Sequence, residues 1–285
     1  GGCLAAAARA DEAVTIAANS TGARRFYAGG QEFRPFGVNY IHVHVGKPYQ
    51  SFNMFDDAAY ARARIAADFK MIAAAGFNYV RIWLKGLDVD AGWGRGAPGV
   101  SRTYVERIAQ TIEDARKAGL RVSLNGLFRK GQWLPGNYRP EGPGAADLDG
   151  ENRLLLDPAF AEALGRFYED LLFDLQRSDK TILDGVFYFD LYSEIRFNLG
   201  RAPFAPPVRD FAFADARYDL RRPLERQALM DRATELWFRT VAGHVRRAAP
   251  RLLLTVGGFP NVAVGHRGFD GGTREARVGV ADENA

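Results

Sequence analysis

Short apolar segments alternate with amphipathic segments along most of the chain. The apolar runs at residues 36–40, 79–84, 121–125, 186–192 and 252–256 have the length of buried strands. The longer segments between them carry apolar residues at helical spacing, for example Ile65, Phe69 and Ile72. Strands that alternate with helices in this order predict parallel βα units, and so either a doubly wound sheet or a (β/α)8 barrel.

Two helices have recognisable start signals. Asp157 followed by Pro158 is typical of an N-cap and a first helical residue. Thr103 and Glu106 have the spacing of a capping box at the start of another helix. A third helix, over about residues 223–244, leads into the last apolar run.

The choice between the two architectures depends on motifs. Neither G-x-G-x-x-G nor G-x-x-x-x-G-K-[ST] follows any expected strand, which argues against a nucleotide-binding doubly wound sheet. A small hairpin turning at residues 28–31 precedes the first strand and is expected to close the base of a barrel. The sequence therefore predicts an α/β fold of the TIM-barrel, or (β/α)8, type.

The spacing of the strands predicts an incomplete barrel. Residues 36–256 hold about five of the eight strands that such a barrel needs. We therefore expect residues 21–285 to form a barrel that ends before strands six to eight.

Composition narrows the class of protein. The 285 residues are 47% hydrophobic and 25% charged, as in a packed globular enzyme. The net charge is +4, but acidic residues are interspersed with the basic ones, so we expect no nucleic-acid partner. A single cysteine, Cys3, excludes a disulfide framework, a cysteine zinc cluster and an iron–sulfur site. No apolar stretch approaches the roughly 18 residues of a membrane span.

The first 20 residues resemble the end of an export signal. Gly1, Gly2 and Cys3 before an alanine-rich stretch resemble a bacterial lipoprotein signal, with Cys3 as the candidate lipid anchor. Alternatively, residues 8–10 (ARA) have the A-x-A form of a secretory cleavage site, or the segment is a linker. The first two interpretations predict a bacterial protein that is periplasmic, extracellular or anchored in the outer membrane.

Candidate reactive residues follow the expected strands at their carboxyl ends, where barrel enzymes place their active sites. These residues are Asn39, Tyr40, His42 and His44 after the first strand, Arg81 and Trp83 on the second, Asn125 on the third, and Asp190, Ser193 and Glu194 on the fourth.

Three of these segments carry a family resemblance. Residues 33–40 (FRPFGVNY), 76–83 (GFNYVRIW) and 190–194 (DLYSE) together resemble the first half of a clan A glycoside hydrolase, closest to the cellulase and mannanase type of family 5. The resemblance covers about residues 25–258. It implies an enzyme that hydrolyses O-glycosidic bonds in a β-linked glucan or mannan by a retaining, two-carboxylate mechanism, without a cofactor.

The resemblance also implies roles for individual residues. Glu194 would be the general acid/base; the alternative is a surface ion pair with Arg196. Arg81 would hold the catalytic carboxylates in their charge states; an ion pair with Asp190 inside the barrel is the alternative, and is compatible with that role.

Further residues are expected to contact the sugar. They are Asn39, Tyr40, His42, Asn125, Ser193 and Trp133, with Trp93 and Tyr138 as other loop aromatics of interest. Asn39 could equally satisfy a backbone group at the end of its strand.

The chain departs from the family at three points. Ser193 stands where the family has an asparagine, and the third strand ends in Asn125 without the histidine common in family 5. The family's nucleophile is a glutamate on strand seven, so the chain as given is expected to lack it. Asp282 and Glu283 lie where strand six would begin and are not nominated.

Two other functions stay open. The chain could be a non-catalytic, exported carbohydrate-binding protein on a degenerate barrel, an alternative that Ser193 favours. The H-x-H pair His42 and His44 also resembles amidohydrolase barrels that bind a metal. Those barrels need a lysine on strand four and further histidines, whereas here strand four has no lysine and His244 is expected on a helix, so no metal is expected.

Overall fold

The computed structural model describes residues 12–41, 54–55, 59–84, 101–126, 148, 150–193 and 195–257, and the statements below concern these residues. Among them, no helix combines the length and the apolar character needed to cross a membrane.

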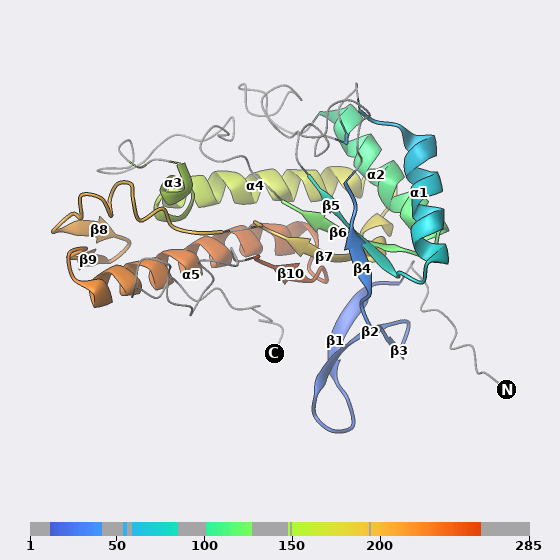
Figure 1. Ribbon diagram of the computed structural model, residues 1–285, viewed down its shortest axis with the longest axis horizontal. Coiled ribbons are helices and arrows are strands. Elements are labelled where there is room, and N and C mark those ends of the chain that lie inside the picture. Colours follow the sequence, from blue (N-terminus) through green and yellow to red (C-terminus); the bar gives the residue numbers. More distant parts are fainter. Residues whose placement is uncertain are drawn as a thin grey trace.

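A parallel sheet of five strands forms the centre of the molecule (Figure 1). Its strands are β4 (Gly37–Asn39), β5 (Tyr79–Trp83), β6 (Arg121–Asn125), β7 (Val186–Asp190) and β10 (Leu254–Thr255). Neighbours in the sheet follow one another in the chain, in the order β10-β7-β6-β5-β4, and every described pair is parallel. A doubly wound sheet would reverse its order at a switch point. The prediction of an incomplete (β/α)8 barrel is confirmed, because over the described residues the sheet stays open between β4 and β10.

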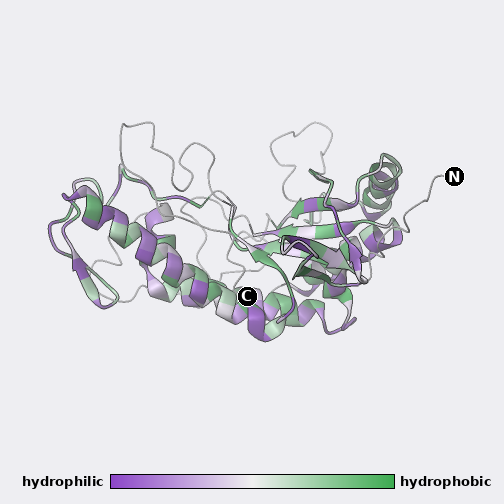
Figure 2. Cartoon of the chain, turned by 90° about the horizontal axis from the view of Figure 1, so that it is seen from below, coloured by the Kyte–Doolittle hydropathy of each residue, from purple (hydrophilic) through white to green (hydrophobic). Residues whose placement is uncertain are grey.

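The helices connect these strands. They are α1 (Arg62–Ala74), α2 (Arg102–Lys117), α3 (Gly150–Leu156), α4 (Pro158–Leu175), the 3-10 helix η4 (Ile182–Gly185) and α5 (Pro223–Ala248). Hydrophilic and hydrophobic residues alternate along α5 in Figure 2, as expected of a helix that packs with one face only.

The predicted start of α4 is confirmed and that of α2 is wrong. Asp157 accepts a hydrogen bond from the backbone of Ala159, and Pro158 is the first residue of the helix. α2 begins after Ser101 without a side-chain cap, so Thr103 and Glu106 lie inside the helix and form no capping box. Ser101 already precedes Thr103 with a residue type that suits the N-cap position, which the capping-box interpretation overlooked.

The amino-terminal sheet has one strand more than predicted. β2 (Arg24–Ala28) and β3 (Gln31–Glu32) form the expected hairpin, and β1 (Val14–Ala18) pairs with β2 in antiparallel register. β1 lies in the first 20 residues, for which the sequence predicts the end of an export signal or a linker. Its β-branched residues suit a strand, and Val14 is buried, so the folded unit begins before residue 21.

The hairpin packs against the barrel at the ends where its strands begin. The rings of Phe26 and Phe33 contact Phe187 edge to face, with centroids 5.1 and 5.0 Å apart. Together with Val14 and Ala28 they form a small core separate from the main one. The predicted closure of the barrel base is confirmed.

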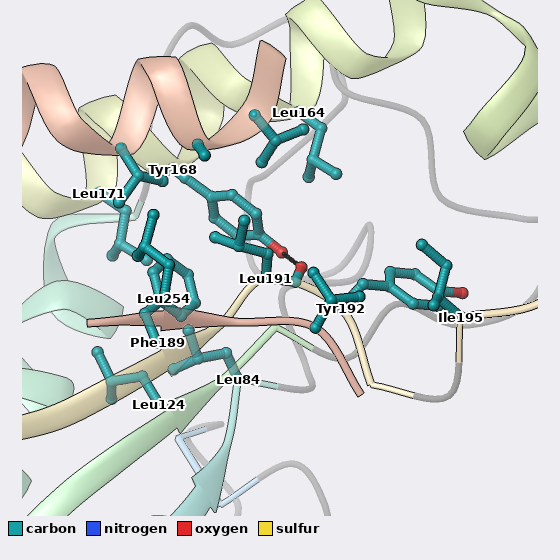
Figure 3. Close-up of a cluster of buried hydrophobic side chains, with 14 of the residues drawn as sticks. Leu84, Leu124, Leu164, Tyr168, Leu171, Phe189, Leu191, Tyr192, Ile195 and Leu254 are labelled. Atoms are coloured by element: carbon teal, nitrogen blue, oxygen red, sulfur yellow. Dashed lines mark hydrogen bonds between the residues drawn. The ribbon is translucent and has the colours of Figure 1, made fainter. Parts of the chain in front are cut away.

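The main core lies between the sheet and the helices (Figure 3). Tyr168 of α4 lies in its middle and contacts the ring of Phe189 edge to face at 4.7 Å. Leu84 and Leu124 pack from the sheet side, and both are fully buried.

An irregularity in β7 determines which of its side chains face the barrel interior. Val122 pairs with Val186, and Leu124 pairs with Phe189. Two residues along β6 therefore match three residues along β7. The extra residue in β7 is a bulge, which shifts the alternation of side chains by one. Phe189 consequently faces the helices, and Asp190 faces the interior together with Arg81.

The connection between β7 and α5 is held from α3. The side chain of Asn152, which is fully buried, donates hydrogen bonds to the carbonyl oxygens of Asn198 and Ala202 and accepts one from the amide of Asn198, at 2.8–2.9 Å. Further along, β8 (Phe211–Phe213) and β9 (Ala216–Tyr218) form a hairpin. The connection between β7 and α5 therefore contains two short strands of its own.

Candidate active site

Arg81 connects three strands at the mouth of the open barrel. Its Nη2 donates to Oδ2 of Asp190 at 2.6 Å and to Oγ of Ser193 at 3.1 Å. Its Nη1 lies 3.5 Å from Oδ1 of Asn39. The guanidinium carbon lies 4.5 Å from the ring centroid of Trp83, so the cation also rests on an aromatic face. Arg81 therefore contacts four other residues that were expected at the site.

The register of the sheet explains this grouping. Asn39 pairs with Arg81 across β4 and β5, so both side chains point to the same face of the sheet. Asp190 reaches that face because of the bulge in β7. The ion pair between Arg81 and Asp190, anticipated from the sequence as an alternative role for the arginine, is present inside the barrel.

The carboxylate of Asp190 is almost completely enclosed. Its side chain is 3% exposed, against 20% for Arg81. Besides the bond from Arg81, its Oδ1 accepts a hydrogen bond of 3.1 Å from the amide of Gly257, just after β10. Burial raises the pKa of Asp190, and the hydrogen bond and charge of Arg81 only partly oppose that shift.

Glu194 itself lies outside the described residues, but its neighbours on both sides are placed. Ser193 is bonded to Arg81, and the amide of Ile195 donates to the carbonyl oxygen of Gly257 at 2.9 Å. The amide of Gly257 donates in turn to the carbonyl oxygen of Tyr192 at 3.0 Å. The backbone on either side of position 194 is therefore attached to the chain that leaves β10.

Asn125 ends β6 in register with Trp83 on one side and Asp190 on the other. Its side chain is fully buried, and neither its oxygen nor its nitrogen has a hydrogen-bond partner among the described residues. A buried amide without partners is costly. Its predicted contact with a sugar stays a prediction.

Tyr40 does not join this group. Its hydroxyl donates to Oδ2 of Asp68 on α1 at 2.7 Å, and its ring contacts Phe69. Burial raises the pKa of Tyr40 well above its ordinary value, and the hydrogen bond to Asp68 acts in the same direction. The physical reason is alternation along the chain: Asn39 faces the interior, so the next residue faces the helices.

Several other candidates lie outside the described residues. They are Cys3, His42, His44, Trp93, Trp133 and Tyr138. His244, expected on a helix, lies on α5, where its two ring nitrogens contact Glu162 and Glu169 of α4 at 2.9 and 2.6 Å. Over the described residues, no three His, Cys, Asp or Glu side chains are placed so that they could hold a metal ion.

Two residues that hold the backbone near the site were not predicted from the sequence. Gly257 follows the last expected strand, and a glycine at such a strand end is a weak signal that the backbone makes a close contact there. Asn152 carried no signal, because its partners are backbone groups 46 and 50 residues away.

Comparisons with known proteins add the following. No family model matches the chain, and no curated protein matches it. Among solved structures, it is similar to an exo-β-1,4-mannosidase from Opitutaceae bacterium strain TAV5, with 20% identity, a TM-score of 0.46, and coverage of 85% of this chain and 33% of that one.

Two further structures are similar to a comparable degree. A GH5_18 protein from Streptomyces cattleya, solved in complex with GlcNAc, has 18% identity and a TM-score of 0.47 over 79% of this chain and 44% of that one. The β-mannanase from the blue mussel Mytilus edulis has 12% identity and a TM-score of 0.49 over 87% of this chain and 64% of that one. The chain thus spans between a third and two thirds of the length of these proteins.

Proposed function

We propose that this chain forms the acid/base half of a retaining glycoside hydrolase that is similar to family 5 and acts on a β-linked glucan or mannan. The observation that supports the proposal most is the contact of Arg81 with Asp190 and Ser193, directly beside position 194 and at the carboxyl ends of parallel strands. In barrel enzymes, this is the end at which chemistry takes place.

The proposed reaction has two steps. Glu194, as a carboxylic acid, protonates the glycosidic oxygen while the bond from that oxygen to the anomeric carbon breaks, and a second carboxylate forms a glycosyl-enzyme ester. Glu194, now ionised, then takes a proton from a water molecule that attacks the anomeric carbon and releases the second carboxylate. The glycan leaves with its anomeric configuration retained.

Asp190 is not a good candidate for the second carboxylate. Both of its oxygens are engaged, by Arg81 and by Gly257, and its side chain is nearly fully buried. We expect the nucleophile to be a different carboxylate of the intact protein. We also propose that the protein is exported, either with Cys3 as a lipid anchor or with a cleaved signal.

The proposal is tested in the intact protein with a panel of β-1,4-linked mannan and glucan oligosaccharides. We expect hydrolysis with retention, followed by NMR of the anomeric protons. The variant Glu194→Gln should lower kcat by about 10²–10⁴-fold, because it removes the proton donor, and should still bind the sugar. Glu235→Gln, in an exposed ion pair on α5, is the matched control and should leave kcat unchanged.

The same panel of oligosaccharides distinguishes a glycoside hydrolase from the non-catalytic alternative. A carbohydrate-binding protein on a degenerate barrel would bind the oligosaccharides, for example in a calorimetric titration, without releasing products. Unaltered hydrolysis by Glu194→Gln would contradict the role of Glu194.

A further inference from the structure

We propose that Asp190 is a positioning residue that, through Arg81 and Gly257, fixes the chain on both sides of position 194 without touching the substrate. This inference rests on the proposed function and goes beyond it, because it assigns a task to a buried carboxylate that the mechanism does not use.

The two oxygens of Asp190 accept hydrogen bonds from groups on opposite sides of β7. Oδ2 accepts the 2.6 Å bond from Arg81 of β5, and Oδ1 accepts the 3.1 Å bond from the amide of Gly257 after β10. β5 and β10 lie on opposite sides of β7, with β6 between β5 and β7. One carboxylate therefore connects elements on both sides of β7, the strand that precedes the candidate acid.

Each of the two partners holds a residue next to position 194. Arg81 donates to the hydroxyl oxygen of Ser193 through the same Nη2 that binds Asp190. Gly257 accepts from the amide of Ile195 and donates to the carbonyl of Tyr192. A change at Asp190 consequently reaches the residues before and after position 194 by two separate routes.

The guanidinium of Arg81 has limited freedom as long as Asp190 is ionised. It rests on the ring of Trp83, and a charge-assisted hydrogen bond fixes its edge. Without the carboxylate, the partners that remain among the described residues at the edge of the cation are the neutral groups of Ser193 and Asn39.

The buried ion pair between Arg81 and Asp190 is not an efficient way to stabilise the fold. Burial raises the pKa of Asp190 in spite of Arg81, so its ionised form is less favourable in the folded chain than in water. Burying a carboxylate and an arginine together often adds little net stability. A contribution to the geometry of the site explains the pair better than a contribution to the free energy of unfolding.

The chain offers a matched control for this pair. Arg62 of α1 donates to both oxygens of Asp114 on α2, at 2.8 and 2.9 Å, and the side chain of Asp114 is also buried. The Arg62–Asp114 pair joins two helices on the outside of the sheet and contacts none of the residues around Arg81. Asp114→Asn therefore removes the same kind of ion pair without touching the site.

The test compares Asp190→Asn with Asp114→Asn in the intact protein. Asparagine keeps the shape of the side chain and an oxygen for Gly257, but loses the charge that holds Arg81. We expect kcat to fall by about 10²-fold with KM little changed, since a misplaced reacting group costs about that much. Asp114→Asn should leave kcat unchanged.

A pH profile separates positioning from mere stability. In Asp190→Asn the positive charge of Arg81 is no longer neutralised, which favours the ionised form of a nearby carboxyl group. The basic limb of kcat/KM, which reports the protonated acid, should therefore move to lower pH in Asp190→Asn and stay in place in Asp114→Asn. An unchanged kcat and an unchanged pH profile in Asp190→Asn would overturn the inference.

Two further measurements keep the inference testable if Asp190→Asn does not fold or if the proposed function is wrong. If Asp190→Asn does not fold, Arg81→Met, which keeps a long, unbranched side chain but has no donor for Asp190 or Ser193, should show the same loss of kcat, and full activity would contradict the inference. If the intact protein neither hydrolyses nor binds any glycan, the proposed function fails. The inference is then judged on the crystal structure of Asp190→Asn: loss of the Arg81–Ser193 bond supports it, and an unmoved Arg81 contradicts it.

Discussion

Tyr168 of α4 donates a hydrogen bond of 2.7 Å from its hydroxyl to the backbone oxygen of Leu191, the first residue after β7 (Figure 3). The tyrosine is fully buried, and burial raises its pKa well above the ordinary value. The bond attaches the helix layer to the chain that runs towards position 194.

We expect Tyr168→Phe to lower the free energy of unfolding by about 1–3 kcal/mol, because it leaves the buried carbonyl of Leu191 without this donor. Chemical denaturation measures the loss. Tyr60→Phe, which removes a half-buried bond to Gln110, is the control and should cost less. Equal losses in the two variants would argue against the buried bond.

Gly126 and Gly243 should respond to alanine in opposite directions. A Cβ at Gly126 would lie 2.2 Å from the hydroxyl of Tyr168 and 3.0 Å from the oxygen of Leu191, so Gly126→Ala should cost about 1–3 kcal/mol. A Cβ at Gly243, inside α5, meets nothing within 4 Å, so Gly243→Ala should stabilise by about 0.5–1 kcal/mol. Thermal unfolding of both variants checks the two signs, and stabilisation by Gly126→Ala would contradict the packing described.

Asn152→Ala should loosen the start of the connection between β7 and α5. It removes three hydrogen bonds to the backbone of Asn198 and Ala202, and we expect a cost of about 2–4 kcal/mol. Hydrogen exchange at the amide of Asn198 should become faster. Asn198→Ala, which loses a single exposed bond to Gly200, is the control, and a comparable cost for both would count against the role of Asn152.

The contact between α4 and α5 should weaken in acid. Arg247 beside Glu169, with a smaller contribution from His244, holds the pKa of that carboxyl below its ordinary value of 4.5. A depressed pKa in the folded state stabilises the fold above the unfolded pKa, and this contribution is lost as the pH falls through the folded pKa.

Urea denaturation between about pH 6 and about pH 3 tests this pH dependence. Stability should fall less steeply with decreasing pH in Glu169→Gln than in the wild type. Glu106→Gln, in an exposed pair with Arg102, should follow the wild type. A Glu169→Gln curve parallel to the wild type would contradict the prediction.

The order of strands and most helices could be predicted from the sequence, because a buried parallel strand is a short apolar run and an amphipathic helix has a clear period. The Asp157–Pro158 start of α4 is local chemistry and was predicted correctly. The face of the sheet on which a side chain lies was harder to predict from the sequence. Tyr40 was assigned to the site, but simple alternation places it against Asp68.

The position of Asp190 shows a second limit. Strict alternation from Val186 would have turned Asp190 towards the helices, and only the bulge between the pairs Val122–Val186 and Leu124–Phe189 turns it inwards. A bulge depends on pairing with the neighbouring strand, and no residue type in β7 indicates that a bulge forms there. The hydrogen bond from Gly257 depends likewise on a partner 67 residues away.

The most direct test of the central claim uses Glu194→Ala in the intact protein with dinitrophenyl β-mannoside and β-glucoside. The good leaving group needs no proton, so the glycosyl-enzyme should still form but should hydrolyse slowly without the base. Added azide should restore turnover and give the β-glycosyl azide, with natural β-glycans remaining uncleaved. Absence of rescue by azide together with undiminished cleavage of the natural glycans would contradict the assignment of Glu194 as the acid/base.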